Sequence, residues 1–572
     1  MEQLWNDLVY DNTFFFVYQT VLRYAMPAFC GLLLLRCIRP LLTFRREPEI
    51  WAWLCLTDGK KLPITHWESV IGRSKRSDVV IDVPTISRSH AVLTRYDDGS
   101  WTISDAQSKS GTMVNGELID ISPLDEKDII TIGGVNLTLQ PISQRQEIRL
   151  SQLRTKAAKP VRSIANLLLL TVIQFFCCFS YLLSPNVKEA AMIFTGFMGI
   201  VVCQWALLAF YLIIKKPSFE LETMAFFLCT FGMAAIAAVK PGESVKQLLA
   251  IVLGLCLFLG IGWSMRDMER AKKMRYFAAV SGILLLLITL VFGKEYHGAK
   301  NWLILGSLSI QPSELSKVCF VFVGASALDR LVNRRNLILF ILYTLVICIC
   351  LAVMNDFGTA LIFFVAFLLI AYMRSGSVGT IALACASVGF AGILAVRIAP
   401  HALRRFASWR HIWEDPLDTG YQQTRALMCI ASGGFFGVGA GNGWMKRIFA
   451  ADSDVVFATV AEEWGILILL MAVVCILVYG LFTLRSAAAT RSSFHTIVSC
   501  TAAGIFLVQA ILNVLGTVDI LPLTGVTFPF LSNGGSSMIC AWGLLAFIKA
   551  ADTRQNASFA VRQQKEGRHA DE

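Results

Sequence analysis

The sequence predicts a multi-pass α-helical membrane protein with an all-β sandwich inserted near its N-terminus. Of its 572 residues, 55% are apolar and only 16% are charged, whereas about a quarter of the residues in a soluble domain are charged. The shortage of charge is local, because residues 51–162 have the composition of a soluble domain and most of the remainder does not. Several apolar runs outside that segment reach the roughly 20 residues that cross a hydrocarbon core.

The first apolar run, residues 13–38, is expected to be an uncleaved membrane anchor. A signal peptide has a shorter apolar core followed by small residues. Here the run ends among arginines, and acidic residues precede it. Because positive charge stays on the cytoplasmic side, residues 1–50 are predicted to form an anchor whose N-terminus lies outside the cell.

Residues 51–143 alternate between apolar and polar in short runs, with turn sequences at 58–59, 97–99 and 133–134. Many short strands at close spacing indicate an all-β sandwich. Residues 144–162 then form a basic linker to the membrane part of the chain.

The membrane part, residues 163–550, is predicted to cross the membrane repeatedly. Short Lys/Arg-rich loops alternate with uncharged ones along it, which is the pattern of cytoplasmic and external loops. This pattern places the sandwich and the tail at 551–572 in the cytoplasm and the long loop 398–455 outside. The expected spans are 163–183, 190–214, 221–239, 243–264, 276–293, 315–331, 337–354, 358–373, 377–397, 456–483, 496–516 and 529–550.

The net charge of +11 is explained by these loops. Since the positive residues do not gather on one soluble face, nucleic acid is excluded as a partner. The sixteen cysteines lie in apolar or half-buried contexts without a CxxC pair, so they are expected to be buried small hydrophobes. We expect no disulfide framework and no metal site.

A set of short motifs runs through the predicted sandwich. Their order and spacing resemble the forkhead-associated (FHA) domain over residues 51–140, which implies an 11-strand sandwich with a loop-built phosphothreonine site. The motifs are Gly72-Arg73, Ser87-Arg88-Ser89-His90-Ala91, Asp105, Ser108, Gly111-Thr112 and Asn115-Gly116.

The FHA resemblance makes Arg73, Ser87 and Arg88 the phosphate ligands and gives His90 the part of a brace for the loop. Ser110 belongs to the same site, where the family usually has asparagine. Guanidinium groups, a hydroxyl and backbone amides suit a phosphate dianion. The alternative is a sandwich that has lost this site and serves only for docking.

Polar residues at a membrane are costly and therefore indicate function. Four clusters stand out in the membrane part: 301–302 with 311–317, 355–360, loop 398–455, and 522–537. The topology places them outside or near the outer surface.

Loop 398–455 has the features of an active site before any family is considered. Its arginines and tryptophans suit a diphosphate and a sugar beside a membrane. Asp415 precedes a proline, which keeps it off a regular helix, and the glycine-rich stretch 431–443 suggests a broken segment that lines a cavity. The alternatives are interfacial anchoring for the tryptophans, a solvated carboxylate for Asp415, and structural pairing for the glutamates Glu314, Glu462 and Glu463.

Together the four clusters resemble the FtsW/RodA/SpoVE (SEDS) family of peptidoglycan glycosyltransferases over about 163–550. The matching motifs are QPSE at 311–314, D-x-G-T-A at 356–360, D-P-x-x-x-G-Y-Q at 415–422, A-E-E-x-G at 461–465 and P-F-x-S-x-G-G-S at 529–536. The chain departs from the family pattern at Thr424-Arg425, at 452–457 and at Asn533. It also has two more predicted spans ahead of Trp302 than the family's ten-span core.

The SEDS resemblance implies polymerisation of lipid II at the outer face of a bacterial membrane, with undecaprenyl diphosphate as leaving group. Asp415 matches the family's essential aspartate and would act as the base, and Trp302 matches its functional tryptophan. Cations would stabilise charge on the diphosphate, and Gln311 and Glu314 would contact the substrate. The candidate cations are Arg404, Arg405 and Lys317.

No cofactor is evident in the sequence, while a divalent cation on the diphosphate stays open. The implied partners are a class B penicillin-binding protein and a phosphothreonine-bearing protein downstream of a Ser/Thr kinase. Two other functions stay open: a flippase for the lipid-linked precursor, and a non-catalytic membrane-anchored FHA scaffold.

Overall fold

The structure is a computed structural model that describes most of the chain. It covers 12–43, 50–143, 160–375, 408–487 and 492–558, and five single residues between 379 and 389. Inside these ranges it leaves out 67, 76, 97–98, 185–188, 267, 297–298, 307, 328–333, 553 and 555–556.

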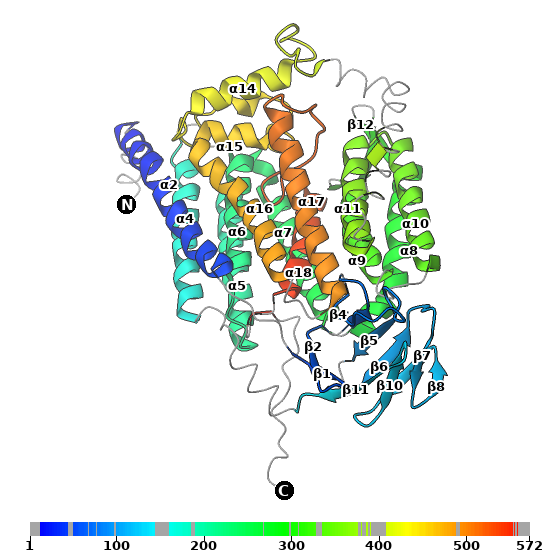
Figure 1. The fold of residues 1–572 in the computed structure, drawn as a ribbon. Helices are drawn as coiled ribbons and strands as arrows, with labels where there is room; N and C mark the ends of the chain where they lie inside the picture. The colour runs from blue at the N-terminus through cyan, green and yellow to red at the C-terminus, as the bar shows by residue number, and fades with distance from the viewer. Residues whose placement is uncertain are drawn as a thin grey trace.

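A body of packed helices carries a β-sandwich at one end, which we call the sandwich side (Figure 1). At the opposite end, the α14 side, the helices α14 and α15 lie across the bundle (Figure 1). The helices are α2 (Asn12–Leu42), α4 (Pro160–Leu182), α5 (Ala190–Ile213), α6 (Glu220–Val239), η1 (Pro241–Glu243), α7 (Ser244–Ser264), α8 (Met268–Phe292), α9 (Pro312–Ala327), α10 (Arg334–Val353), α11 (Phe357–Ser375), α14 (Tyr421–Gly433), η2 (Met445–Arg447), α15 (Val456–Trp464), α16 (Ile466–Ala487), α17 (Ser493–Thr517) and α18 (Gly535–Ala550).

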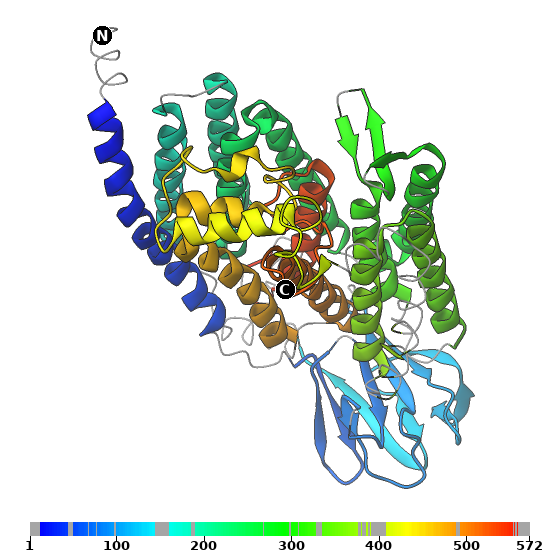
Figure 2. The same cartoon turned by 90° about the horizontal axis from the view of Figure 1, so that it is seen from above.

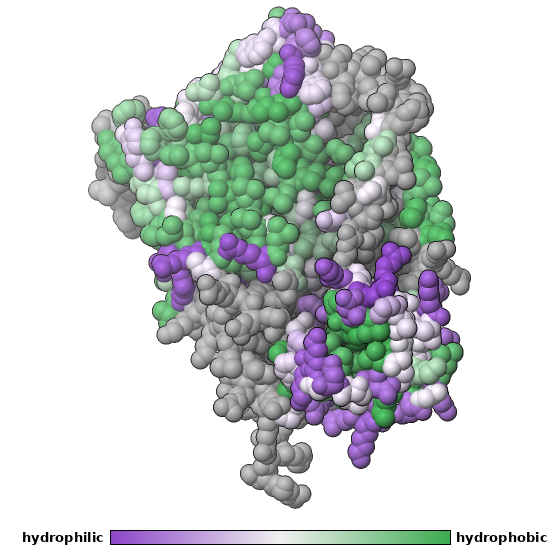
Figure 3. All heavy atoms as spheres, viewed as in Figure 1, coloured by the Kyte–Doolittle hydropathy of each residue, from purple (hydrophilic) through white to green (hydrophobic). Residues whose placement is uncertain are grey.

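Eight of the described helices are long and apolar enough to cross a membrane, and three shorter ones are also apolar. Apolar side chains cover the visible flank of the helical body, while the sandwich and the α14 side carry polar residues (Figure 3). The predicted fold class, a multi-pass helical membrane protein with an inserted all-β sandwich, is confirmed.

The central helix of the body is α6, which is buried along almost its whole length from Glu220 to Ala237. It packs against α2, α4, α5, α7, α15 and α16, while α8–α11 stand together at one side of the body (Figure 2). Near α6, Trp542 of α18 packs against Phe226, Phe258 and Phe530 with ring centroids 4.9–5.8 Å apart. Such aromatic contacts add to the apolar burial that holds the helices together.

One predicted span, 456–483, is wrong as a single helix. The chain breaks at Gly465 into α15, which lies across the α14 side, and the membrane-length α16 (Figure 1). Gly465 has a φ of 88°, and a Cβ there would stand 2.4 Å from the carbonyl oxygen of Phe435. Only glycine fits this turn. Segment 377–397, another predicted span, lies outside the described residues apart from single positions.

The sandwich has two sheets with the strand orders β2-β1-β11-β10-β7-β8 and β4-β3-β5-β6-β9. Its own hydrophobic core contains Leu54, Ile71, Leu93, Ile103 and Ile130. The strands are β1 (Ala52–Leu56), β2 (Lys61–Ile64), β3 (Glu68–Gly72), β4 (Val79–Val80), β5 (Ala91–Arg95), β6 (Trp101–Asp105), β7 (Thr112–Val114), β8 (Glu117–Ile119), β9 (Ile121–Leu124), β10 (Ile129–Ile132) and β11 (Val135–Pro141).

A third, three-stranded sheet lies between α8 and α9 on the α14 side. It consists of β12 (Lys294–Tyr296), β13 (Ala299–Leu305) and β14 (Leu308–Ile310), in that order. This sheet carries Trp302 and leads directly into the first turn of α9.

Buried ion pairs tie the C-terminal end of α18 to the start of α6 on the sandwich side. Lys549 lies 3.1 Å from Glu222 and donates a 2.8 Å hydrogen bond to the Ser218 carbonyl. Arg554 bridges Glu220 and Asp552 at 3.3 and 2.7 Å. Every one of these buried charges therefore faces an opposite charge, as burial requires.

Lys549→Met should destabilise the helical body by roughly 3–5 kcal/mol, because it leaves the buried Glu222 carboxylate without its cation. The measurement is thermal and denaturant unfolding of the protein in lipid nanodiscs. The matched control is Lys549→Met combined with Glu222→Leu, which removes both charges and should recover most of the loss. Equal stability of the single variant and the parent would contradict the role of this pair.

Candidate functional site

The start of α9 brings together three of the predicted substrate-binding residues. Lys317 and Glu314 are buried and form an ion pair at 2.7 Å. Gln311 Nε2 donates to Asp356 Oδ2 at 3.2 Å, and Asn301 Nδ2 donates to the same oxygen at 3.0 Å. We call Asn301, Gln311, Glu314, Lys317 and Asp356 the α9 cluster.

Local structure explains how the α9 cluster assembles. Proline at the first position of α9 suits a helix start, and Gln311 therefore stands at the turn from β14 into the helix. Asp356 precedes α11 and accepts a 3.1 Å hydrogen bond from the backbone N–H of Thr359, which is an N-cap. Trp302 directly follows Asn301 in β13 and is half-buried.

Several buried polar atoms of the α9 cluster have no hydrogen-bond partner in the described part of the chain. They include Asn301 Oδ1, and the buried hydroxyl of Ser313, next to Glu314 in α9, likewise has no partner there. The Lys317–Glu314 contact is close but poorly directed for a hydrogen bond, so both atoms keep unused capacity. Since native proteins satisfy most buried polar groups, this concentration indicates a place for a polar ligand or for ordered water.

Asp415 lies elsewhere on the α14 side, in an exposed turn that spans 412–420. Its carboxylate oxygen Oδ2 accepts hydrogen bonds from the N–H and hydroxyl of Thr419 at 3.4 and 3.3 Å. Its carbonyl accepts from the N–H of Gly420 at 3.0 Å. A Cβ on Gly420 would stand 2.1 Å from the Ile412 carbonyl oxygen, so glycine is what lets this turn close.

The segment just before the turn that carries Asp415 is hydrogen-bonded to the residues that follow α17. Trp409 Nε1 donates to the Ile520 carbonyl at 3.1 Å, and the Arg410 N–H donates to Asp519 at 3.2 Å. No hydrogen bond or ion pair between described residues joins Asp415 to the α9 cluster. Arg404 and Arg405, the two other predicted cations, lie outside the described residues.

The two glutamates of α15 have structural partners. Glu462 accepts hydrogen bonds from the N–H groups of Trp444 and Met445 at 2.9 and 2.8 Å and so caps η2. Glu463 accepts from the Tyr181 hydroxyl at 2.6 Å. This favours the structural reading of both residues over a catalytic one.

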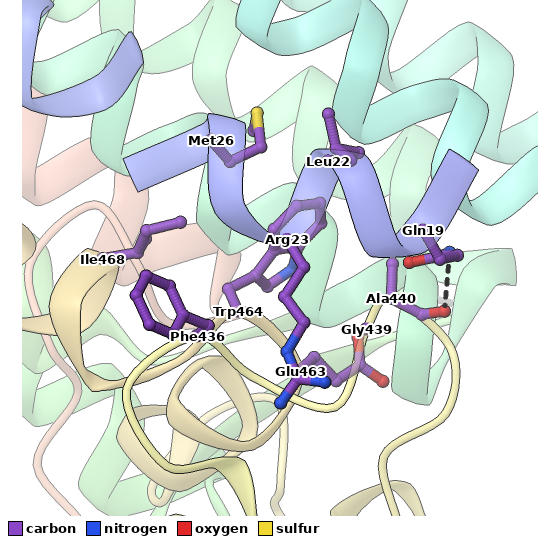
Figure 4. A pocket seen from close by; sticks show the side chains of 10 residues that line it. All are labelled: Gln19, Leu22, Arg23, Met26, Phe436, Gly439, Ala440, Glu463, Trp464 and Ile468. Carbon is purple, nitrogen blue, oxygen red and sulfur yellow. Dashed lines mark hydrogen bonds between the residues drawn. The ribbon is translucent and has the colours of Figure 1, made fainter. Parts of the chain in front are cut away.

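A pocket beside Glu463 separates α2 from the glycine-rich loop. Gln19 and Arg23 of α2 line one side, and Phe436, Gly439 and Glu463 line the other (Figure 4). The Gln19 side chain donates a 3.4 Å hydrogen bond to the Ala440 carbonyl. None of the predicted catalytic residues lines this pocket.

Two of the family departures noted in the sequence contact each other. Asn533 Nδ2 donates to Asp452 and to Glu243, both at 2.6 Å, and Asp452 pairs with Lys240 at 3.1 Å. Arg425, another departure, stacks over the Tyr421 ring at 5.3 Å. Sequence reasoning assigned no role to Asp356, Asp452 or Lys240. The D-x-G-T-A motif was the available signal for Asp356, whereas nothing in the sequence joins Lys240 to Asp452.

In the sandwich, three loops meet at the predicted phosphothreonine site. Arg73 and Arg88 are exposed, and the Arg73 N–H donates to the Ser87 carbonyl at 3.0 Å. The Ser87 hydroxyl accepts from the Lys109 N–H at 3.0 Å, which leaves its hydrogen available for donation. Ser110 contacts the Thr85 carbonyl at 3.4 Å.

His90 braces these loops, as the sequence leads one to expect. It is fully buried, accepts from the Ser87 N–H at 3.1 Å and contacts the Gly111 carbonyl at 3.1 Å. Gly72 lies so close to the next loop that a Cβ would stand 2.3 Å from the Arg88 carbonyl oxygen. The two arginines are therefore held next to each other by the backbone rather than by their own side chains.

The fold defines the class: a multi-pass helical membrane protein with an inserted β-sandwich whose loops carry two exposed arginines. The family model for FtsW/RodA/SpoVE cell cycle proteins matches residues 223–557, and the FHA domain model matches residues 69–133. The chain belongs to the FtsW/RodA/SpoVE family, and its sandwich is an FHA domain.

Two relatives are similar to more than half of the chain. The probable peptidoglycan glycosyltransferase FtsW of Tolumonas auensis is 31% identical over 361 residues, which cover 59% of this chain and 93% of that protein. The peptidoglycan glycosyltransferase RodA of Mycobacterium bovis is 28% identical over 53% of this chain and 69% of its own. A chain of a solved peptidoglycan synthase complex is 26% identical, with a TM-score of 0.49 over 58% of this chain and 96% of that chain.

Asp105 should make the free energy of unfolding of the FHA domain depend on pH in the acidic range. Burial opposes its ionisation, but hydrogen bonds from Ser108 and Thr112 outweigh burial and lower its pKa. A carboxyl with a lowered folded pKa stabilises the fold above its unfolded pKa, about 4, and that stabilisation is lost as pH falls through the folded pKa.

Urea unfolding of residues 50–143 between pH 2 and pH 7 should therefore show a loss of stability below about pH 4. Asp105→Asn should flatten this loss, whereas Asp125→Asn, on an exposed turn, should keep it. A parent-like acid profile in the Asp105 variant would refute the assignment.

Proposed function

We propose that this protein is a peptidoglycan glycan-strand polymerase that uses lipid II at the outer face of a bacterial plasma membrane. The observation that carries the proposal is the α9 cluster, in which buried charged side chains and half-buried amides have unused hydrogen-bonding capacity, in a chain of the FtsW/RodA/SpoVE family. The names of the relatives support the same activity.

Each predicted residue has a distinct part in this reaction. Asp415 takes the proton from the acceptor's N-acetylglucosamine 4-hydroxyl as that oxygen attacks the anomeric carbon of the donor's N-acetylmuramic acid. Its Oδ2 atom is held by Thr419, which orients the carboxylate in an exposed turn that a substrate can reach. Lys317, with Arg404 and Arg405, stabilises the departing diphosphate.

Gln311, Glu314 and Trp302 belong to the substrate-binding part of the site. Gln311 and Glu314 orient polar groups of the substrate, and Trp302 in β13 offers an aromatic surface to a sugar. Because Asp415 and the α9 cluster are separate, the substrate itself bridges them. The proposal requires no resident cofactor, and any divalent cation arrives with the diphosphate.

The α14 side is the external side, and the FHA domain and the C-terminus are cytoplasmic. The Lys/Arg-rich loops on the sandwich side support this orientation. It also gives the FHA domain access to cytoplasmic kinases. A class B penicillin-binding protein that cross-links the new strand is the expected partner in the membrane.

Asp415→Asn should lower the rate of lipid II polymerisation at least 10²-fold, because the amide has nearly the same shape but cannot accept the proton. The assay uses purified full-length protein in nanodiscs, with glycan strands separated by gel electrophoresis. Asp418→Asn is the matched control, since it changes another exposed aspartate of the same turn and should leave the rate within about two-fold.

Full activity of Asp415→Asn would exclude a base at this position. A parent protein that moved labelled lipid II across vesicles without polymerising it would support the flippase function in place of the polymerase. A parent protein without either activity would leave the anchored scaffold as the function.

The second part of the proposal is that the FHA domain binds a phosphothreonine-bearing protein and so recruits or gates the polymerase. The exposed Arg73 and Arg88, the available Ser87 hydroxyl and the buried His90 brace support it. Charge-assisted hydrogen bonds to phosphate contribute about 1.5–3 kcal/mol each.

Arg73→Ala in residues 50–143 should weaken binding of a phosphothreonine peptide by at least ten-fold, as loss of one such contact implies. Arg73→Lys should keep only part of the affinity, because lysine has the positive charge but lacks the paired N–H donors of the guanidinium group. Lys127→Ala removes an exposed charge far from the loops and serves as the control. Calorimetry measures the binding of phosphothreonine, phosphoserine and unmodified peptides to the parent domain and to each of the three variants. A parent domain that binds none of these peptides would show that the site has been lost.

A further inference from the structure

A charged side chain of the FHA domain is buried against the helical body. Glu68, the first residue of β3, is 8% exposed and accepts a 2.8 Å hydrogen bond from the hydroxyl of Ser493. The two residues are 425 positions apart in the chain. Glutamate is almost never buried unless it is paired, so the buried state of Glu68 indicates a contact between the two domains.

The partner surface is the N-terminus of α17, which suits a carboxylate. Ser492 is the N-cap and Ser493 the first helical residue, where backbone N–H groups and the helix dipole favour negative charge. Ser492 is itself engaged with His495, 2.8 Å from its Nδ1. Both drawn views place the sandwich against this end of the helical body (Figures 1 and 2).

The start of α17 is firmly attached to the helix that bears the α9 cluster. Phe494 packs edge-on against Phe322 of α9 with ring centroids 5.7 Å apart. A displacement of the α17 N-terminus would therefore move α9 as well.

The other end of α17 holds the external loops. Asn513 Nδ2 donates to the carbonyls of Asp454 and Val526, both at 2.8 Å, and the Gly516 carbonyl accepts from Gln423 at 3.2 Å. The helix has 25 residues, or about 37 Å at 1.5 Å per residue. It thus connects the FHA contact on the sandwich side to the segment that carries Asp415 on the α14 side.

The phosphothreonine site is joined to the same contact by a single strand. β3 begins at Glu68 and ends at Gly72, and Arg73 follows immediately. Four steps along a strand span about 13 Å. The docking residue and the phosphate ligand therefore lie at opposite ends of one rigid element.

We propose that the FHA domain docks on the N-terminus of α17 through Glu68 and Ser493, and that this interface transmits phosphothreonine binding to the external loops. The transmission rests on the proposed function, whereas the docking does not. The interface is intramolecular, because the FHA domain contacts the first turn of α17 in the same chain.

Cross-linking tests the docking in the full-length protein in nanodiscs. Glu68→Cys with Ser493→Cys should give a linked peptide pair with a short bismaleimide, detected by mass spectrometry after proteolysis. The matched control is Glu117→Cys with Ser493→Cys, because Glu117 is exposed on β8 at the edge of the other sheet. The first pair should exceed the control at least ten-fold; equal yields would overturn the docking.

The transmission is tested by conservative variants that break only the contact. Glu68→Gln and Ser493→Ala should each leave the basal polymerisation rate and the affinity for a library-selected phosphothreonine peptide within two-fold of the parent. In the parent that peptide should change the rate at least three-fold, and in both variants the change should disappear.

Full retention of the peptide's effect in both variants would overturn the transmission. A parent that binds the peptide without any change in rate would also overturn it, and cross-linking would still decide the docking. A parent that does not bind phosphothreonine peptides at all contradicts the proposed FHA function, and the cross-linking result stands independently of that outcome.

Discussion

The ion pairs between α6 and the end of α18 are the constraint on which the helical body depends. The central helix α6 has no lipid-facing side, so the carboxylates in its first turn cannot reach water at the flank. Lys549 and Arg554 supply the opposite charges and thereby hold the end of α18 and the residues just after it against the start of α6. These ion pairs help to position the helices around α6 and the loops that those helices carry on the α14 side.

The α9 cluster, near the opposite end of the body, also places polar side chains out of contact with water. Buried polar atoms are also concentrated in the α9 cluster, but part of their hydrogen-bonding capacity is unused. An unsatisfied buried group costs stability, so a chain keeps such groups where a ligand will meet them. Among the described residues, the network on the sandwich side leaves only Glu220 Oε1 without a hydrogen bond, whereas Asn301, Glu314 and Lys317 of the α9 cluster each have such an atom.

The FHA domain is a distinct unit with its own core, yet its placement gives it a role in the whole. Its ligand loops are held by backbone contacts and by His90, which leaves both arginines exposed. Its hydrogen bond to the helical body, from Ser493 to Glu68, falls at the start of the helix that continues to the α14 side. One helix thereby joins the FHA domain to the α14 side.

Much of the fold could be predicted because its signals are local. An apolar run of about 20 residues must span or be buried, so α4, α5, α6 and α17 are visible in the sequence. The FHA loops are visible for a related reason, since the motif residues that shape them lie within a short stretch of chain.

The break between α15 and α16 could not be predicted, because apolar composition continues through Gly465 and only its contact with the Phe435 carbonyl requires the turn. The residues that complete the α9 cluster come from separate segments, with Gln311 and Asp356 45 positions apart. The contact of Asp452 with Asn533 and that of Glu68 with Ser493 span still longer separations.

The sequence by itself determined the class of protein, the residue types of both sites and the presence of two modules. Periodicity, charge and motif spacing are properties of neighbouring residues, and they act before the chain is packed. Only the tertiary structure decided which polar side chains are satisfied, which carboxylates are structural and where the FHA domain is attached. Those outcomes depend on which distant groups share a low-dielectric space, because the cost of burying a polar group is set by the partner it meets there.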